Sequence, residues 1–199
     1  MTTKAAPAER PLRADAAKNR ARILRAAEEV FAAEGIAVPV DLVAERAGLG
    51  VGTLYRHFPT KEALFEAIVV ARLEELLATV KERPDDAAPG EALFAFLREI
   101  SHHASTKHDL IDALGSAGID IKSRCAALID EIKRHVEQLR CRAVAAGAVR
   151  ADVSADEMVG LVVGTCQAAG HAGPDDVNLR RMMEVVCDGL RAPATGRSR

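Results

Sequence analysis

The segment Val40–Lys61, VDLVAERAGLGVGTLYRHFPTK, contains two short apolar patterns that meet at a glycine. The apolar residues recur at helical spacing on both sides: Val40, Val43, Ala44 and Ala47 before it, and Val51, Leu54, Tyr55 and Phe58 after it. Gly48 lies where a tight turn needs a residue that tolerates positive φ. The pattern predicts a helix-turn-helix whose second helix, about residues 51–57, enters a major groove. An ordinary structural corner between two helices fits the same spacing.

Charge supports the nucleic-acid interpretation of this segment. Residues 1–61 carry ten Lys or Arg against seven Asp or Glu, a net charge of +3, and residues 62–199 carry 17 against 22, a net charge of −5. Between Arg10 and Arg25 there are six basic residues and one acidic residue, Asp15. A basic surface of this kind suits a polyanion, although a solvated basic tail gives the same composition.

The composition predicts an all-α protein. Hydrophobic residues make up 49% of the 199 residues, which allows a sizeable core, while aromatic residues make up only 3%. The four cysteines are far apart and form no CxxC pair, so we expect buried thiols and no metal site or cofactor. The N-terminus lacks a signal-peptide pattern and no apolar run is long enough to span a membrane. These features predict a cytoplasmic protein.

Apolar periodicity along the chain predicts about nine helices. We expect a mobile basic arm over residues 1–14, a helix-turn-helix domain over 15–61, a helical domain over 62–191 and a disordered tail over 192–199. Thr60 is the predicted N-cap of a long helix, and Ser154 and Glu157 form a capping box. A helix of about residues 122–146 is predicted between them, ending at Gly147.

Four short motifs in the N-terminal part resemble those of the TetR (tetracycline repressor) family of bacterial transcription regulators. They are Ile23-Leu-x-Ala-Ala27, Phe31-x-x-x-Gly35, Val43-Ala-x-x-Ala-Gly48 and Gly52-Thr-Leu-Tyr-x-His-Phe-x-x-Lys61. The resemblance covers about residues 18–66 and implies a DNA-binding domain followed by a ligand-binding and dimerisation domain. It implies a regulator rather than an enzyme.

The resemblance also implies contacts with double-stranded DNA at a near-palindromic operator. The residues concerned are Arg46, Gly50, Val51, Thr53, Tyr55, Arg56, His57 and Lys61. Hydroxyls and the Lys61 ammonium would meet phosphates, and Val51 would pack on a thymine methyl. One departure is clear, because Val38, Pro39 and Val40 stand where many relatives have a Thr or Ser that caps the first motif helix.

The family resemblance further implies a repressor that an unidentified small-molecule effector releases from DNA. Apolar stripes supply pocket candidates: Leu73, Leu77, Phe94, Leu97, Ile129, Ile132, Met158 and Val162. Such stripes are more often part of an ordinary core than the lining of a pocket. The last two helices, about residues 154–169 and 178–190, are expected to form a homodimer, although their apolar faces could instead close the monomer core. An alternative function is a DNA-binding or helical interaction module without a ligand response.

A group of histidines and aspartates, His102, His103, His108, Asp109 and Asp112, also allows a metal interpretation. Adjacent histidines on a helix point about 100° apart, and the group lacks the i, i+4 spacing of helical ligands. We therefore predict no metal site here.

Overall fold

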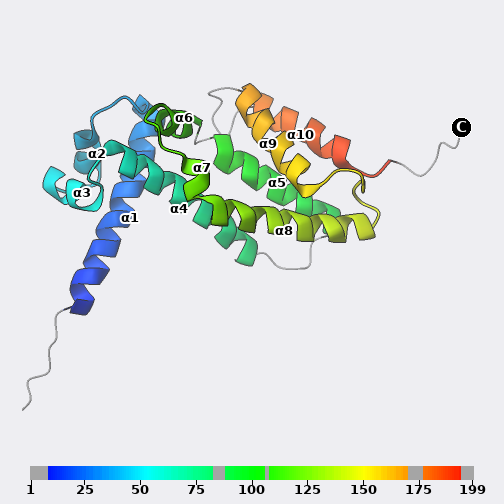
Figure 1. Cartoon of the computed structure of the whole chain (residues 1–199), viewed down its shortest axis with the longest axis horizontal. Coiled ribbons are helices and arrows are strands. Elements are labelled where there is room, and N and C mark those ends of the chain that lie inside the picture. Colours follow the sequence, from blue (N-terminus) through cyan, green and yellow to red (C-terminus); the bar gives the residue numbers. More distant parts are fainter. Residues whose placement is uncertain (1–8, 83–87, 106–107, 170–176, 194–199) are drawn as a thin grey trace, which may run out of the picture. The chain divides into compact units, whose positions relative to one another are not determined.

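The computed structural model describes residues 9–82, 88–105, 108–169 and 177–193, and these residues form ten helices without a β-strand (Figure 1). The all-α prediction is confirmed. The tenth helix arises because the helix predicted over residues 122–146 is two helices, α7 (Ile121–Arg124) and α8 (Ala126–Ala145). Asp120 caps α7 by accepting from the Ser123 backbone N–H at 3.2 Å, and Cys125 (φ −96°, ψ 7°) separates the two helices.

By its internal contacts the chain divides into two compact units, Met1–Ile68 and Val69–Arg199. The division falls inside helix α4 (Lys61–Glu82), seven residues later than the predicted boundary between residues 61 and 62. The first two turns of α4 belong to the first unit because Leu64, Phe65 and Ile68 are buried there. The Phe65 ring meets the Phe31 ring edge-on, with 5.3 Å between centroids.

The first unit begins with helix α1 (Glu9–Glu34), which starts six residues before the predicted start at Asp15. Residues 9–14 of the predicted arm are therefore helical, and residues 1–8 lie outside the described part of the chain. Pro11 is compatible with this start, because backbone N–H groups in the first turn of a helix have no intrahelical acceptor. Ile23, Ala27 and Val30 form the buried stripe of α1.

Helices α2 (Val40–Arg46) and α3 (Val51–His57) follow, and the predicted helix-turn-helix is present. Gly48 has φ +62°, and the Leu49 backbone N–H donates to the Ala44 carbonyl at 2.9 Å. Helix α2 starts after Pro39, which makes no side-chain capping bond. Helix α4 starts after Thr60, whose hydroxyl accepts from the Ala63 backbone N–H at 3.1 Å as predicted.

The second unit consists of the rest of α4 and six further helices. These are α5 (Pro89–Ser105), α6 (His108–Ser116), α7, α8, α9 (Ala155–Ala169) and α10 (Val177–Leu190). Helix α5 packs against α8 and α9, and α9 packs against α10 (Figure 1). The predicted capping box is present, with the Ser154 N–H donating to Glu157 Oε2 at 2.7 Å and the Glu157 N–H donating to Ser154 Oγ at 3.3 Å. The bond from the Ser154 backbone lowers the pKa of Glu157.

Two further expectations for the second unit need correction. Ala192, the first residue of the predicted disordered tail, donates its backbone N–H to the Ala148 carbonyl at 3.1 Å, and residues 194–199 lie outside the described part. Cys141 is exposed, whereas Cys125, Cys166 and Cys187 are buried as expected. Cys141 lies on the solvent side of α8, where its thiol donates to Glu137 Oε1 at 3.2 Å. Within the described ranges, no helix has the length and apolar character that a membrane crossing requires.

Candidate functional site

Helix α3 has one buried side and one exposed side. Leu54 is 1% exposed and Phe58, which ends the helix, is 3% exposed. On the other side Val51 and Tyr55, one turn apart, are 39% and 45% exposed, although both are large apolar side chains. Gly52 beside them faces open space, so another surface can approach the backbone of α3 closely. The exposed side of α3 is therefore shaped for contact with a partner.

Arg22 of α1 holds the turn between α2 and α3. Its guanidinium donates to the Ala47 carbonyl at 2.6 Å and to the Gly48 carbonyl at 3.4 Å. A Cβ atom on Gly48 would lie 3.0 Å from the guanidinium nitrogen, so the glycine allows both the positive φ and the close approach of Arg22. From the sequence alone, Arg22 is predicted only as one of the basic residues between Arg10 and Arg25. The signal that could have identified it is the need of the last carbonyls of a short helix for outside donors.

Arg20 lies two residues before Arg22 on α1, and its guanidinium carbon lies 5.7 Å from the centroid of the Phe58 ring. From one helix, Arg22 thus supports the turn that precedes α3, and Arg20 packs on Phe58 at the end of α3. Lys18 and Arg25 of the same helix are exposed. Arg20 and Arg22 are exposed as well, so their contacts with the turn and with Phe58 leave them at the surface of α1.

Lys61 is half-buried, and its Nζ donates to the Val38 carbonyl at 2.7 Å. The same ammonium lies 5.7 Å from the centroid of the Phe65 ring. Lys61 therefore supports the connection before α2, where the side-chain cap expected from relatives is missing. The phosphate contact of Lys61 stays a prediction. In it, the same ammonium would donate both to a phosphate and to the Val38 carbonyl.

The remaining predicted DNA contacts lie on or beside the exposed side of α3. Arg46 donates to Glu29 Oε2 at 3.1 Å, with both side chains more than half exposed, so this pair contributes little stability and its guanidinium can change partners. Arg56 and Gly50 are exposed, and Thr53 and His57 are half-buried. All these residues lie within the first unit.

The second unit contains a cavity of about 400 Å³, open to solvent on one side, between α4 and the helices that follow it. Three of the eight predicted pocket residues line it, namely Leu73, Ile129 and Ile132. The other five, Leu77, Phe94, Leu97, Met158 and Val162, are buried in the hydrophobic core instead. Each apolar stripe is wide enough to face both the core and the cavity, and periodicity alone does not separate the two.

The histidine and aspartate group, for which the sequence predicts no metal site, lies on and after α5. His103 is buried, and its Nε2 lies 3.3 Å from Glu99 Oε1 on the same helix. The side chains of His108, Asp109 and Asp112 lie outside the described part. Among side chains that the structure describes, no group of three or more His, Cys, Asp or Glu residues could hold a metal ion.

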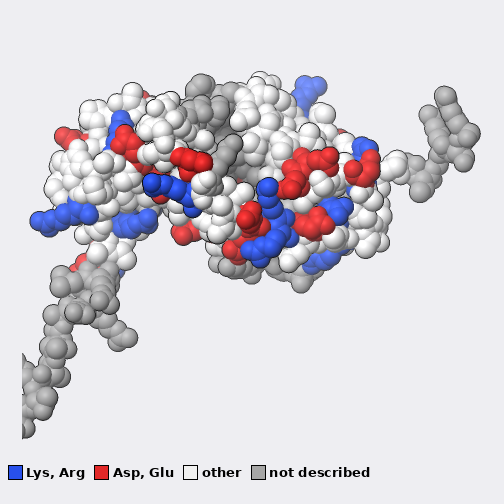
Figure 2. All heavy atoms as spheres, in the orientation of Figure 1, with Lys and Arg blue, Asp and Glu red and all other residues white. Residues whose placement is uncertain are grey.

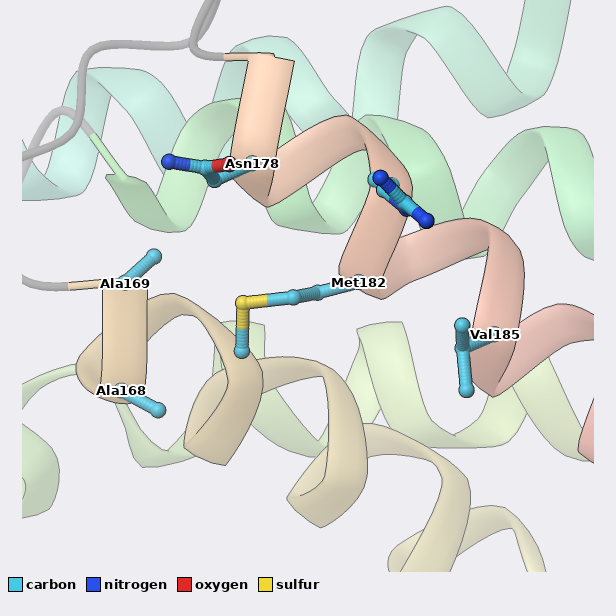
Figure 3. Close-up of a pocket in the computed structure, with 6 residues that line it drawn as sticks. Ala168, Ala169, Asn178, Met182 and Val185 are labelled. Atoms are coloured by element: carbon cyan, nitrogen blue, oxygen red, sulfur yellow. The ribbon is translucent and has the colours of Figure 1, made fainter.

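Helices α9 and α10 carry an apolar outer surface. Leu161 and Val185 are 48% and 68% exposed. A groove of about 490 Å³ lies between the two helices, where Met182 extends from α10 toward α9 near Ala168 and Ala169 (Figure 3). Elsewhere on the face of the second unit seen in Figure 2, acidic and basic side chains are mixed.

Two short helices joined at a glycine, with the second exposed on one side, define a helix-turn-helix protein. Residues 23–68 match the sequence model of bacterial regulatory proteins of the tetR family, and residues 88–192 match that of the C-terminal domain of SbtR-like transcriptional regulators. The second match covers more than half of the chain. This protein belongs to the TetR family of transcriptional regulators, which are not enzymes.

Similar structures extend over nearly the whole chain. A TetR regulatory protein from Mycobacterium vanbaalenii is 39% identical with a TM-score of 0.71, covering 92% of this chain and 100% of that one. A TetR regulator from Streptomyces coelicolor is 32% identical with a TM-score of 0.70, covering 88% of this chain and 99% of that one. HTH-type transcriptional regulators from Staphylococcus aureus are 36% identical over 76 residues, which are 38% of this chain and 41% of theirs. The match to these curated relatives thus spans less than half their length.

Proposed function

We propose that this protein is a cytoplasmic, homodimeric repressor that binds a near-palindromic DNA operator and leaves it when a small molecule binds. The observation that carries the DNA-binding proposal is the exposed side of α3. Val51 and Tyr55 stay in solvent there while Leu54 and Phe58 hold the helix to the unit. Exposed apolar side chains on a helix that Leu54 anchors to the unit mark a contact surface.

In this proposal α3 lies in the major groove. The Val51 side chain packs on a thymine methyl, the Thr53 and Tyr55 hydroxyls donate to phosphates, and Arg56 and His57 follow at the end of the helix. Arg46 supplies a guanidinium for a phosphate or a guanine edge after it leaves Glu29. Backbone N–H groups beside Gly50 and the Lys61 ammonium complete the set of phosphate donors.

The homodimer would form through α9 and α10 of both copies. Leu161 and Val185 supply exposed apolar area, and Gly160, Gly164 and Ala168 are exposed positions without large side chains, which permits close helix approach. A two-fold axis between the copies makes this interface self-complementary and places one α3 on each half of a palindrome. The operator symmetry thus depends on the dimer.

The small-molecule response would begin at the cavity. Leu73 and Leu76 of α4 line it, and the same helix begins at Lys61, which bonds to the connection before α2. A ligand that binds better when α4 has shifted would also bias the arrangement of the two α3 helices in the dimer. That differential affinity is the condition for allosteric release.

In vitro selection of bound duplexes from a random pool tests the DNA-binding proposal. We expect an enriched sequence with two related half-sites and a binding constant that falls steeply with salt. Selection that yields no enriched sequence would contradict the proposal, and a single asymmetric site would contradict the dimeric arrangement.

A promoter assay then separates repression from activation, and a thermal-shift screen with small molecules tests for a ligand response.

A further inference from the structure

The walls of the second-unit cavity are almost entirely aliphatic. Eleven of the sixteen side chains that line it are Ala, Val, Leu or Ile. Among these sixteen the only ring is the imidazole of His103, so a flat aromatic ligand would find few stacking partners. The cavity instead suits a flexible saturated chain, which gains from burial in any aliphatic surroundings.

The helices that form two of the walls give the length of the cavity. Along α9 the lining residues run from Val159 to Gln167, and on the other wall they run from Cys125, the N-cap of α8, to Lys133 within that helix. Each run advances eight residues, or about 12 Å at 1.5 Å per residue. With C–C bonds of about 1.5 Å at tetrahedral angles, an extended chain of about ten carbons spans that distance.

The charged side chains that line the cavity are positive. Lys133 is the one lysine or arginine among the lining residues, and these residues include no Asp or Glu. Its side chain is 40% exposed, which places the ammonium at the rim rather than among the aliphatic walls. A cationic ligand would lose hydration there without meeting a carboxylate from the walls, whereas an anionic ligand meets Lys133.

Lys133 already has a carboxylate partner that a ligand can join or replace. Its Nζ lies 2.8 Å from Asp156 Oδ1, and the Asp156 side chain is 72% exposed. The hydrogen bond with Asp156 raises the pKa of Lys133, whose ammonium is charged at neutral pH even at the ordinary lysine value. Because solvent screens exposed ion pairs of this kind, exchanging one carboxylate for another costs little.

We propose that the cavity binds a medium-chain aliphatic carboxylic acid of about ten carbons, with its alkyl chain among α4, α5, α8 and α9 and its carboxylate at Lys133. This assignment rests on the proposed small-molecule response, because it names the chemical class of the effector. The chain length follows from the 12 Å walls, and the position of the head group follows from the single cation at the rim.

Decanoic acid, titrated into the full-length protein by calorimetry below its micelle concentration, tests the assignment. We expect saturable one-site binding, a raised melting temperature, and no comparable binding of decyltrimethylammonium. Lys133→Met should weaken decanoate binding about tenfold, as expected for loss of a charged hydrogen-bond partner. Absence of decanoate binding, equal binding of the cationic analogue, or unchanged affinity in Lys133→Met would overturn the proposal.

A pair of cavity variants locates the alkyl chain. Ile129→Phe fills part of the cavity and should abolish decanoate binding, while Leu128→Phe, at the neighbouring half-buried position that does not line the cavity, should keep it. Circular dichroism identifies a variant that fails to fold. In that case Val159→Leu, a smaller addition on the α9 wall, replaces it and should weaken binding. Full binding by a folded cavity-filling variant would place the ligand elsewhere.

The selected operator duplex separates this assignment from the wider function. Decanoate that binds and releases the duplex supports both proposals. Decanoate that binds without affecting the duplex supports the ligand class but contradicts ligand-driven release. If other compounds raise the melting temperature and release the duplex while decanoate does neither, the repressor proposal stands and the ligand class is wrong.

Discussion

The two compact units of this chain hold their helices in different ways. In residues 1–68, α2 and α3 have seven residues each, which is too short for stability in isolation, and side chains from α1 and α4 fix them by bonds to backbone carbonyls. Arg22 reaches Ala47 and Lys61 reaches Val38. In residues 69–199 the helices, which apart from the four-residue α7 have nine residues or more, are held mainly by apolar packing around a core and a cavity.

This difference explains why one unit is easier to interpret from sequence. Directional hydrogen bonds need particular residue types at particular positions, so the sequence of the first unit contains a recognisable motif. Aliphatic packing tolerates many combinations of side chains of similar total volume, so the sequence of the second unit shows only the periodic spacing of apolar residues. Substitutions at bonded and packed positions, and at core and cavity positions, measure this difference between the two units.

The largest expected effect distinguishes core from cavity in the second unit. Leu97 is 0% exposed in the core, whereas Leu73 is half-buried and lines the cavity. Leu97→Ala should lower the free energy of unfolding by about 2–5 kcal/mol, and Leu73→Ala should cost less because part of its side chain faces existing space. Urea denaturation measures both. Equal costs would mean that the cavity wall is packed like the core.

A smaller effect is expected from the bond that holds the turn. Arg22→Met keeps an unbranched side chain but removes the donor to Ala47, and should cost about 1.5–3 kcal/mol. Arg25→Met, at an exposed position of the same helix, is the matched control and should stay within about 0.5 kcal/mol of wild type. Thermal unfolding provides the comparison. If the two variants are equally stable, the turn does not depend on Arg22.

Lys61→Met should lower stability by about 1 kcal/mol, because the bond to the Val38 carbonyl is lost while the side chain keeps its place beside Phe65. It should also weaken DNA binding and reduce the salt dependence if the ammonium reaches a phosphate. Fluorescence anisotropy at several salt concentrations measures this part. A stability loss with unchanged salt dependence would show that Lys61 acts only through Val38.

The smallest expected effect is that of Tyr55→Phe. The hydroxyl is exposed, so the melting temperature should not change, while operator affinity should fall by the value of one hydrogen bond, about 0.5–1.5 kcal/mol. Competition binding against wild type resolves this difference. Unchanged affinity on a selected operator would remove Tyr55 from the proposed contacts.

Helix positions were largely predictable, and their interruptions were not. The capping box at Ser154 and the N-cap at Thr60 were both predicted from side chains that satisfy nearby N–H groups. The break at Cys125 was missed because the apolar pattern continues through it. The start of α1 at Glu9 was also missed, since polar, proline-containing sequence in a first turn resembles a disordered arm.

The all-α class and the helix-turn-helix could be predicted from the sequence alone, because both depend on local periodicity and turn chemistry. Only the tertiary structure decided that Arg22 and Lys61 bond to carbonyls more than twenty residues away, and that Leu73, Ile129 and Ile132 line a cavity while Leu97 does not. The reason is physical. Such bonds and voids depend on how distant helices meet, and a helical stripe has the same spacing whichever neighbour it faces.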